Sequence, residues 1–153
     1  MPPSDRTDRR IAAAAAQCFI ALGGCDKAHR IIEAALEADW DSDLVALYAE
    51  CESGDIVKRI ERAEAWLKRY PGDAALLLTL GRLCADGGLW GKAQSYLEAS
   101  LAVEPTFSAH LALARLQERL GNADAARRHH RESLELALVQ LKAATGGRRR
   151  TPL

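Results

Sequence analysis

The fold is decided by residues 71–105, which read PGDAALLLTLGRLCADGGLWGKAQSYLEASLAVEP. Pro71 and Pro105 lie 34 residues apart, which is the length of a tetratricopeptide repeat. Between them, two apolar stretches with helical spacing are separated by the glycines of the turn at residues 87–88. Because proline cannot continue a helix but suits its first turn, each proline marks the boundary of a unit. The stretch therefore predicts one helical hairpin of this repeat type.

The residue types within this stretch suit two closely packed helices. Gly81 and Ala93 are small, and we expect the two helices of the hairpin to cross most closely there, since a larger side chain would push them apart. Leu97 and Leu101 follow each other at helical spacing and form a stripe that can pack on the next hairpin.

The pattern recurs more loosely on both sides of this unit. A glycine turn precedes Ala28 in the first part of the chain, and another precedes Ala126 in the last part. Residues 43–70 are degenerate and predict an irregular hairpin, because their second helix reaches Pro71 too early for the repeat period. We therefore predict an all-α fold, an α-α superhelix (a right-handed solenoid) of tetratricopeptide-type hairpins with a long C-terminal capping helix.

In domain terms the sequence predicts one repeat domain over residues 1–144 and a disordered tail over residues 145–153, where glycines and arginines gather. The expected hairpins lie near residues 7–40, 43–70, 73–104 and 106–144. The last helix runs past the repeat pattern, and such an extension caps the open apolar face of a repeat array.

Composition excludes several classes of function. The 153 residues carry no formal net charge, so the chain as a whole has no basic excess for nucleic acid or anionic lipid. We expect no nucleic-acid partner and no cofactor. No apolar run is long enough to span a bilayer, and the first residues do not resemble a signal peptide, so a soluble chain is expected. The 4 cysteines have irregular spacing without a CxxC pair, which favours free thiols in a reducing compartment over a disulfide framework or a zinc site.

Three segments carry a closer resemblance. They are Trp66-Leu67-Lys68-Arg69-Tyr70-Pro71-Gly72-Asp73, then Leu76 to Cys84, then Leu89-Trp90-Gly91-Lys92-Ala93 with its continuation to Leu101. Together they resemble the C-terminal repeat region of the proteobacterial HemY family, and the similarity extends from about Arg9 to Leu138. Members of this family are inner-membrane proteins associated with haem biosynthesis.

The resemblance implies a specific role. It implies a non-catalytic scaffold for protein–protein interaction in a late step of protohaem IX biosynthesis, with enzymes of late haem synthesis as partners. Family members carry N-terminal membrane helices, so the resemblance places the full-length protein at the cytoplasmic face of the bacterial inner membrane and makes this chain its soluble repeat region. The family offers no catalytic motif, and we predict no enzymatic activity.

The candidate binding site lies on the concave face, which the first helix of each hairpin lines. Arg82 and Arg115 fall at equivalent positions in successive units, and two guanidinium groups on one wall could hold carboxylates of a peptide or the propionates of a porphyrin. Pairing with Asp86 and Glu118 is the alternative for these arginines. The helical register assigns to this partner-binding groove Arg10, Gln17, Leu78, Arg82, Leu111, Arg115, Glu118 and Arg119.

Two further functions remain open at this point. In the first, the chain binds haem or porphyrin directly, with His110 as the haem ligand. In the second, it is a structural module that forms a homodimer through its long last helix. No metal site is predicted, because the adjacent His129 and His130 point in different directions around a helix.

Overall fold

The computed structural model describes residues 3–52 and 54–149, and these form helices joined by short connections. The elements are α1 (Pro3–Ala21), α2 (Cys25–Ala38), α3 (Ser42–Ala46), the 3-10 helix η1 (Leu47–Ala49), α4 (Ile56–Arg69), α5 (Ala74–Asp86), α6 (Trp90–Val103), α7 (Phe107–Arg119) and α8 (Ala123–Arg149).

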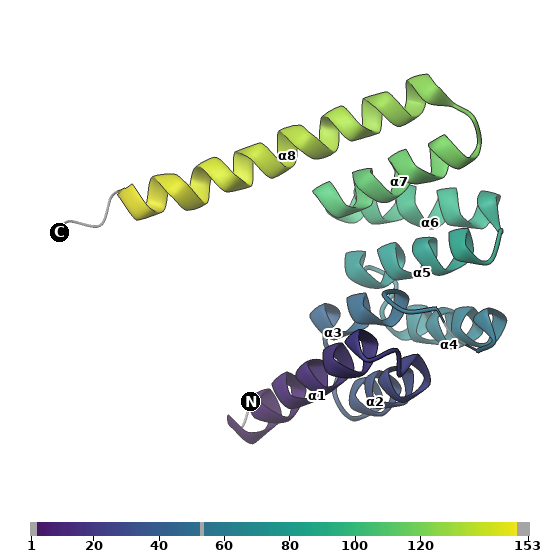
Figure 1. The fold of residues 1–153 in the computed structure, drawn as a ribbon, viewed down its shortest axis with the longest axis vertical. Coiled ribbons are helices and arrows are strands. Elements are labelled where there is room, and N and C mark those ends of the chain that lie inside the picture. The colour runs from purple at the N-terminus through teal and green to yellow at the C-terminus, as the bar shows by residue number, and fades with distance from the viewer. Residues whose placement is uncertain (1–2, 53, 150–153) are drawn as a thin grey trace.

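The helices stack in chain order, from α1 and α2 at one end of the molecule to α7 and α8 at the other (Figure 1). α1 packs on α2, α5 on α6 and α7 on α8, and α5 also contacts α7 of the following unit. A single apolar core runs through the stack and includes Tyr48, Trp66, Leu80 and Leu113. The predicted all-helical α-α superhelix is confirmed.

Local sequence sets where several helices begin. A capping side chain stands before several helices, and its oxygen accepts a hydrogen bond from a backbone N–H of the first turn. The capping residues are Asp41, Asp55, Asp73 and Thr106. Such a cap supplies a partner for a donor that the helix itself cannot satisfy, and contributes about 1 kcal/mol.

Gly81 is buried at the crossing of α5 and α6, as its small size predicts. A Cβ atom at this position would lie 2.5 Å from Cγ of Leu97 and 3.3 Å from the carbonyl oxygen of Ala93. Leu97 itself is 1% exposed. The two helices can therefore approach this closely only because residue 81 has no side chain.

The second hairpin is irregular because its first helix is short. α3 is only 5 residues long and continues as η1, and both pack against α5. The hydroxyl of Thr79 in α5 donates to the carbonyl oxygen of Val45 at 3.2 Å, which ties the short helix to the regular repeat.

The expectation that all cysteines are free thiols is wrong for Cys25 and Cys51. These residues form a disulfide, with Cα atoms 5.7 Å apart and a separation of 26 residues. The irregular hairpin brings the chain after η1 back against the start of α2, where His29 Nε2 donates to the Cys51 carbonyl oxygen at 3.0 Å. Sequence spacing gave no sign of this contact because it depends on where the short helix ends. Cys18 and Cys84 are free, the first exposed and the second buried.

α8 covers α7 with its first half and extends beyond it with its second (Figure 1). Ser133 is buried and donates to the carbonyl oxygen of Phe107 at 2.8 Å, whereas Leu138 and Leu141 are more than half exposed. The helix continues to Arg149, so the predicted disordered tail is helical as far as that residue, and residues 150–153 lie outside the described part of the chain. Glycine at residues 146–147 lowers helix propensity but does not sterically prevent a helix. Among the described residues, no helix has both the length and the apolar character needed to cross a bilayer.

Candidate concave binding site

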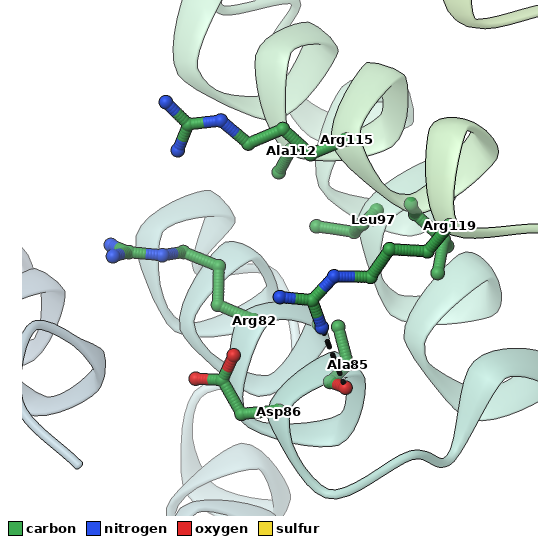
Figure 2. A pocket seen from close by; sticks show the side chains of 9 residues that line it. Arg82, Ala85, Asp86, Leu97, Ala112, Arg115 and Arg119 are labelled. Carbon is green, nitrogen blue, oxygen red and sulfur yellow. Dashed lines mark hydrogen bonds between the residues drawn. The ribbon is translucent and has the colours of Figure 1, made fainter.

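A small cavity of about 150 Å³ lies between α5, α6 and α7 (Figure 2). Its apolar floor includes Leu97 and Leu116, which are 1% and 2% exposed. Charged side chains from α5 and α7 stand at its rim. The residues that line it are Gly81, Arg82, Ala85, Asp86, Leu97, Ala112, Arg115, Leu116 and Arg119.

Contacts with the preceding hairpin hold the side chain of Arg82 in place. Its Nη1 atom forms an ion pair with Oε1 of Glu50 at 3.0 Å, and its Nη2 donates to the carbonyl oxygen of Ala49 at 3.5 Å. The sequence suggested Asp86 as the counterion, but the acid that pairs with Arg82 comes from the end of η1. Arg82 is thereby fixed in orientation at the rim of the cavity.

Arg115 and Arg119 project from α7 over the same cavity (Figure 2). Nη1 of Arg119 donates to the carbonyl oxygen of Ala85 at 3.4 Å, and its guanidinium carbon lies 5.9 Å from the centre of the Trp90 ring. Arg115 is exposed and has no hydrogen bond or ion pair to any other residue that the structure describes. Its guanidinium is therefore available to a ligand.

Asp86 is the only carboxylate among the described residues that line the cavity. Partial loss of water around it raises the pKa of Asp86, and the charge of Glu52 acts in the same direction, while Arg119, Arg82 and Arg59 oppose the shift. The described lining therefore holds three arginines and one carboxylate, so the rim is positively charged.

The structure places the residues predicted for the groove in different settings. Arg82, Arg115 and Arg119 meet at the cavity. Arg10 and Gln17 line a separate hollow between α1 and α3.

The other three predicted groove residues have their own surroundings. Leu78 and Leu111 are half-buried, and Leu78 packs against the core. The carboxylate of Glu118 accepts from His130 Nε2 of α8 at 2.8 Å. Glu118 is therefore directed to α8 and is not among the residues that line the arginine cavity.

His110, the predicted haem ligand in the alternative function, is 8% exposed and lies between α7 and α8. Its Nδ1 atom is 3.1 Å from Nδ1 of His129 and 3.1 Å from Oε2 of Glu132. His129 and Glu132 were not among the predicted site residues. The proximity of His129 could not be found from the sequence, because it depends on how α8 is rotated about its axis against α7.

Comparisons with known proteins agree with the architecture. Neither a protein-family model nor a curated protein matches the sequence of this chain. Among solved structures, the crystal structure of MamA is similar with a TM-score of 0.62 at 14% identity, over 90% of this chain and 89% of that chain. The MamA MSR-1 C2 structure gives a TM-score of 0.51 at 14% identity, over 85% and 77%. A MamA RS-1 ArsTM double mutant gives 0.50 at 15% identity, over 92% and 98%.

At this level of identity the likeness concerns the fold alone. The stacked hairpins, their small residues at the crossing of α5 and α6, and these structural neighbours define the chain as an α-α superhelix of the tetratricopeptide type. The resemblance to the HemY family is not confirmed by these comparisons.

Proposed function

We propose that the chain is a non-catalytic protein-binding module that receives an acidic segment of a partner at the arginine cavity between α5 and α7. The observation that carries the proposal is Arg115, an exposed guanidinium without a counterion among the described residues, beside two arginines already fixed in place. A guanidinium presents parallel N–H donors that match the two oxygens of a carboxylate.

The dimensions of the cavity support a side chain as its occupant. Its volume of about 150 Å³ is below the roughly 300–1,000 Å³ of pockets that enclose drug-sized ligands. An acidic side chain could lay its methylene groups on Leu97 and Leu116 while its carboxylate meets the arginines at the rim. This division between an apolar floor and a polar rim is common in protein interfaces.

The lining also supports recognition in preference to catalysis. The described residues that line the cavity are arginine, aspartate, glycine, alanine and leucine, with no hydroxyl, thiol or imidazole group. A nucleophile with an adjacent base is therefore not present at this site.

The identity of the partner is the finer part of the proposal. The resemblance to the HemY family supports enzymes of late protohaem synthesis at the inner membrane, and the sequence comparisons add nothing to that support. The cavity is too small to enclose a porphyrin, so the arginines could meet only the propionates of such a ligand.

A second candidate function, self-association, is favoured by one observation. The second half of α8 exposes Leu138, Val139 and Leu141 at 52%, 66% and 64%. Exposed apolar side chains at this density on one helix favour contact with another apolar surface. A second copy of α8 would provide one.

The partner can be sought with the wild-type chain and an Arg115→Glu variant as paired baits in a proteobacterial lysate, followed by calorimetry with the purified partner. We expect Arg115→Glu to weaken binding by at least tenfold, and Arg115→Lys to weaken it less, because lysine keeps the charge but loses the paired donors. The matched control is Arg127→Glu, which changes the same charge at an exposed position on α8. Equal affinities of the wild type and Arg115→Glu would overturn the proposed site.

A further inference from the structure

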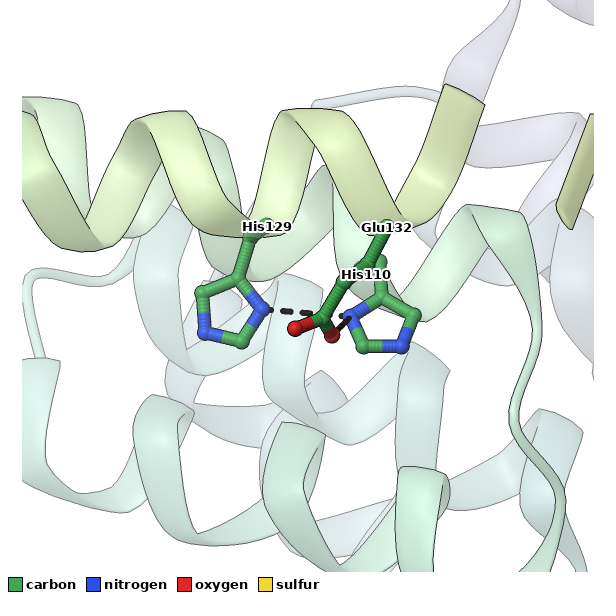
Figure 3. A group of neighbouring side chains, drawn as sticks. All are labelled: His110, His129 and Glu132. Atoms are coloured by element: carbon green, nitrogen blue, oxygen red, sulfur yellow. Dashed lines mark hydrogen bonds and ion pairs between the residues drawn. The ribbon is translucent and has the colours of Figure 1, made fainter. Parts of the chain in front are cut away.

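Two imidazoles and a carboxylate converge in the interface between α7 and α8 (Figure 3). His110 comes from α7, and His129 and Glu132 come from successive turns of α8. Each offers one ligand atom, and the three atoms lie within 4.8 Å of one another. This cluster is separate from the arginine cavity and is not used by the function proposed above.

Two of the three spacings between the ligand atoms are close to those in the coordination shell of a small divalent cation. His110 Nδ1 lies 3.1 Å from His129 Nδ1 and 3.1 Å from Glu132 Oε2. In a tetrahedral zinc site with bonds of about 2.0–2.1 Å, neighbouring ligand atoms are about 3.3 Å apart. An ion could therefore bind His110 with either neighbour near these positions, and all three once the ligand atoms of His129 and Glu132, which lie within 4.8 Å of each other, close on it.

Protons alone cannot give every close contact in this cluster a hydrogen bond. The Nδ1 atom of His110 can carry one proton, which can point to His129 or to Glu132. The other close approach then has no hydrogen bond of its own, and protonation of both rings would set two N–H donors and two positive charges against each other. A cation at the centre would accept a lone pair from all three atoms.

The side chains are also held before any ion binds. His110 is 8% exposed, and the hydrogen bond from Ser133 to the Phe107 carbonyl oxygen fixes α8 against α7 one residue after Glu132.

We propose that His110, His129 and Glu132 bind one zinc-type divalent cation between α7 and α8. Two imidazoles and a carboxylate are a common ligand set for zinc, and three protein ligands leave the fourth position to water or to a donor from another molecule. The side chain of Glu132 is 53% exposed, so the ion can enter from the solvent side. Bound metal links α8 to α7 and stabilises the end of the array.

The test is calorimetric titration of the tag-free, oxidised full chain with zinc chloride, carried out in a Cys18→Ser background to remove the exposed thiol. We expect one equivalent of zinc to bind, and His129→Ala and Glu132→Gln each to weaken binding at least tenfold. The matched control is His130→Ala, the adjacent histidine on the same helix, whose partner is Glu118. This control should bind zinc as the parent chain does.

Three further measurements separate zinc binding from an effect of the substitutions on folding. Circular dichroism should show equal helix content in all the variants, and zinc should raise the thermal midpoint of the parent and the His130→Ala chains but not that of His129→Ala. Cobalt(II), used as a spectroscopic substitute, should give the visible absorption of a four-coordinate site in the parent chain. The absence of saturable zinc binding by the parent, or equal zinc affinity in the folded His129→Ala chain, would overturn the proposal.

Discussion

The indole N–H of Trp40 donates to Oδ2 of Asp73 at 2.8 Å, across a separation of 33 residues. The same carboxylate also accepts from the Ser42 hydroxyl, and its Oδ1 atom accepts from the backbone N–H of Leu76 in the first turn of α5. One side chain thus begins the best-formed repeat and joins it to the irregular hairpin before it.

Replacement of Asp73 by alanine should therefore destabilise the chain. It removes the cap of α5, which contributes about 1 kcal/mol, and leaves the Trp40 N–H without its partner, at a cost of about 1–3 kcal/mol. We expect a total loss of about 2–4 kcal/mol in urea unfolding. The control is Asp124→Ala in the first turn of α8, whose side chain is 98% exposed and which should change stability little. Equal stability of the two variants would contradict the role of Asp73.

Asp73 also predicts part of the acid sensitivity of the chain. Burial alone would raise the pKa of Asp73, but hydrogen bonds from Ser42, Trp40 and Leu76 outweigh it and hold the pKa below the ordinary value of 3.8. The stabilisation is complete above pH 3.8 and is lost as the pH falls from there through the folded-state pKa. In Asp73→Asn this contribution to the acid limb should be absent when urea midpoints are compared across that range.

Reduction of the Cys25–Cys51 disulfide should lower the free energy of unfolding. The bond joins residues separated by 26 positions, and in the chain-entropy model such a bond contributes roughly 3.5 kcal/mol by restricting the unfolded chain. Urea unfolding with and without reductant measures the loss. The Cys25→Ala, Cys51→Ala double variant should unfold at the same midpoint in both conditions, and the exposed Cys18 should be the thiol that reacts in the folded wild type. A wild type whose stability ignores reductant would contradict the prediction.

Two glycine substitutions should have opposite effects. Gly81→Ala places a Cβ against Leu97 at the helix crossing, and overpacking of this kind costs about 1–3 kcal/mol. Gly91→Ala in α6 meets nothing within 4 Å and should stabilise the helix by up to about 0.5–1 kcal/mol. Thermal unfolding of both variants checks the pair, and a stabilised Gly81→Ala chain would mean that the crossing is looser than described.

The exposed apolar side chains on the second half of α8 predict that the chain forms a dimer. If two copies meet through this helix, light scattering should give a mass twice that of the chain, and Leu138→Glu with Leu141→Glu should return it to a monomer, because charges would then be buried in the interface. The same change at Val57, an exposed apolar residue on α4, provides the control and should leave the mass unchanged. A monomeric wild type would remove self-association as a function.

The regular part of the fold could be predicted because its determinants are local. The sequence shows the prolines 34 residues apart, the small residue Gly81 and the apolar stripe that contains Leu97. In the structure, Gly81 lies against the buried side chain of Leu97. Side chains of α5 and α7 that share a register, such as Arg82 and Arg115, could be assigned to one surface for the same reason.

The remaining features depend on geometry that no repeat pattern encodes. The early end of α3 places Glu50 beside Arg82 and Cys51 beside Cys25, and the rotation of α8 about its axis places His129 beside His110. In each case the partners come from different helices or from the connections between them, and a change of one residue in a helix boundary would separate them. The sequence therefore placed Arg82 and Arg115 near each other but did not predict the contacts that Glu50, Cys51 and His129 make.

The ion pair between Arg82 and Glu50 gives the arginine cavity an internal competitor. A partner carboxylate that binds the guanidinium groups of both Arg82 and Arg115 must displace Glu50 from its 3.0 Å contact with Arg82. Binding therefore exchanges one acid for another at Arg82. Because Glu50 follows η1, the strength of that competition is set by the irregular hairpin and not by the walls of the cavity. Removal of the Glu50 charge, as in Glu50→Gln, would consequently tighten binding of the partner while leaving every residue that lines the cavity unchanged.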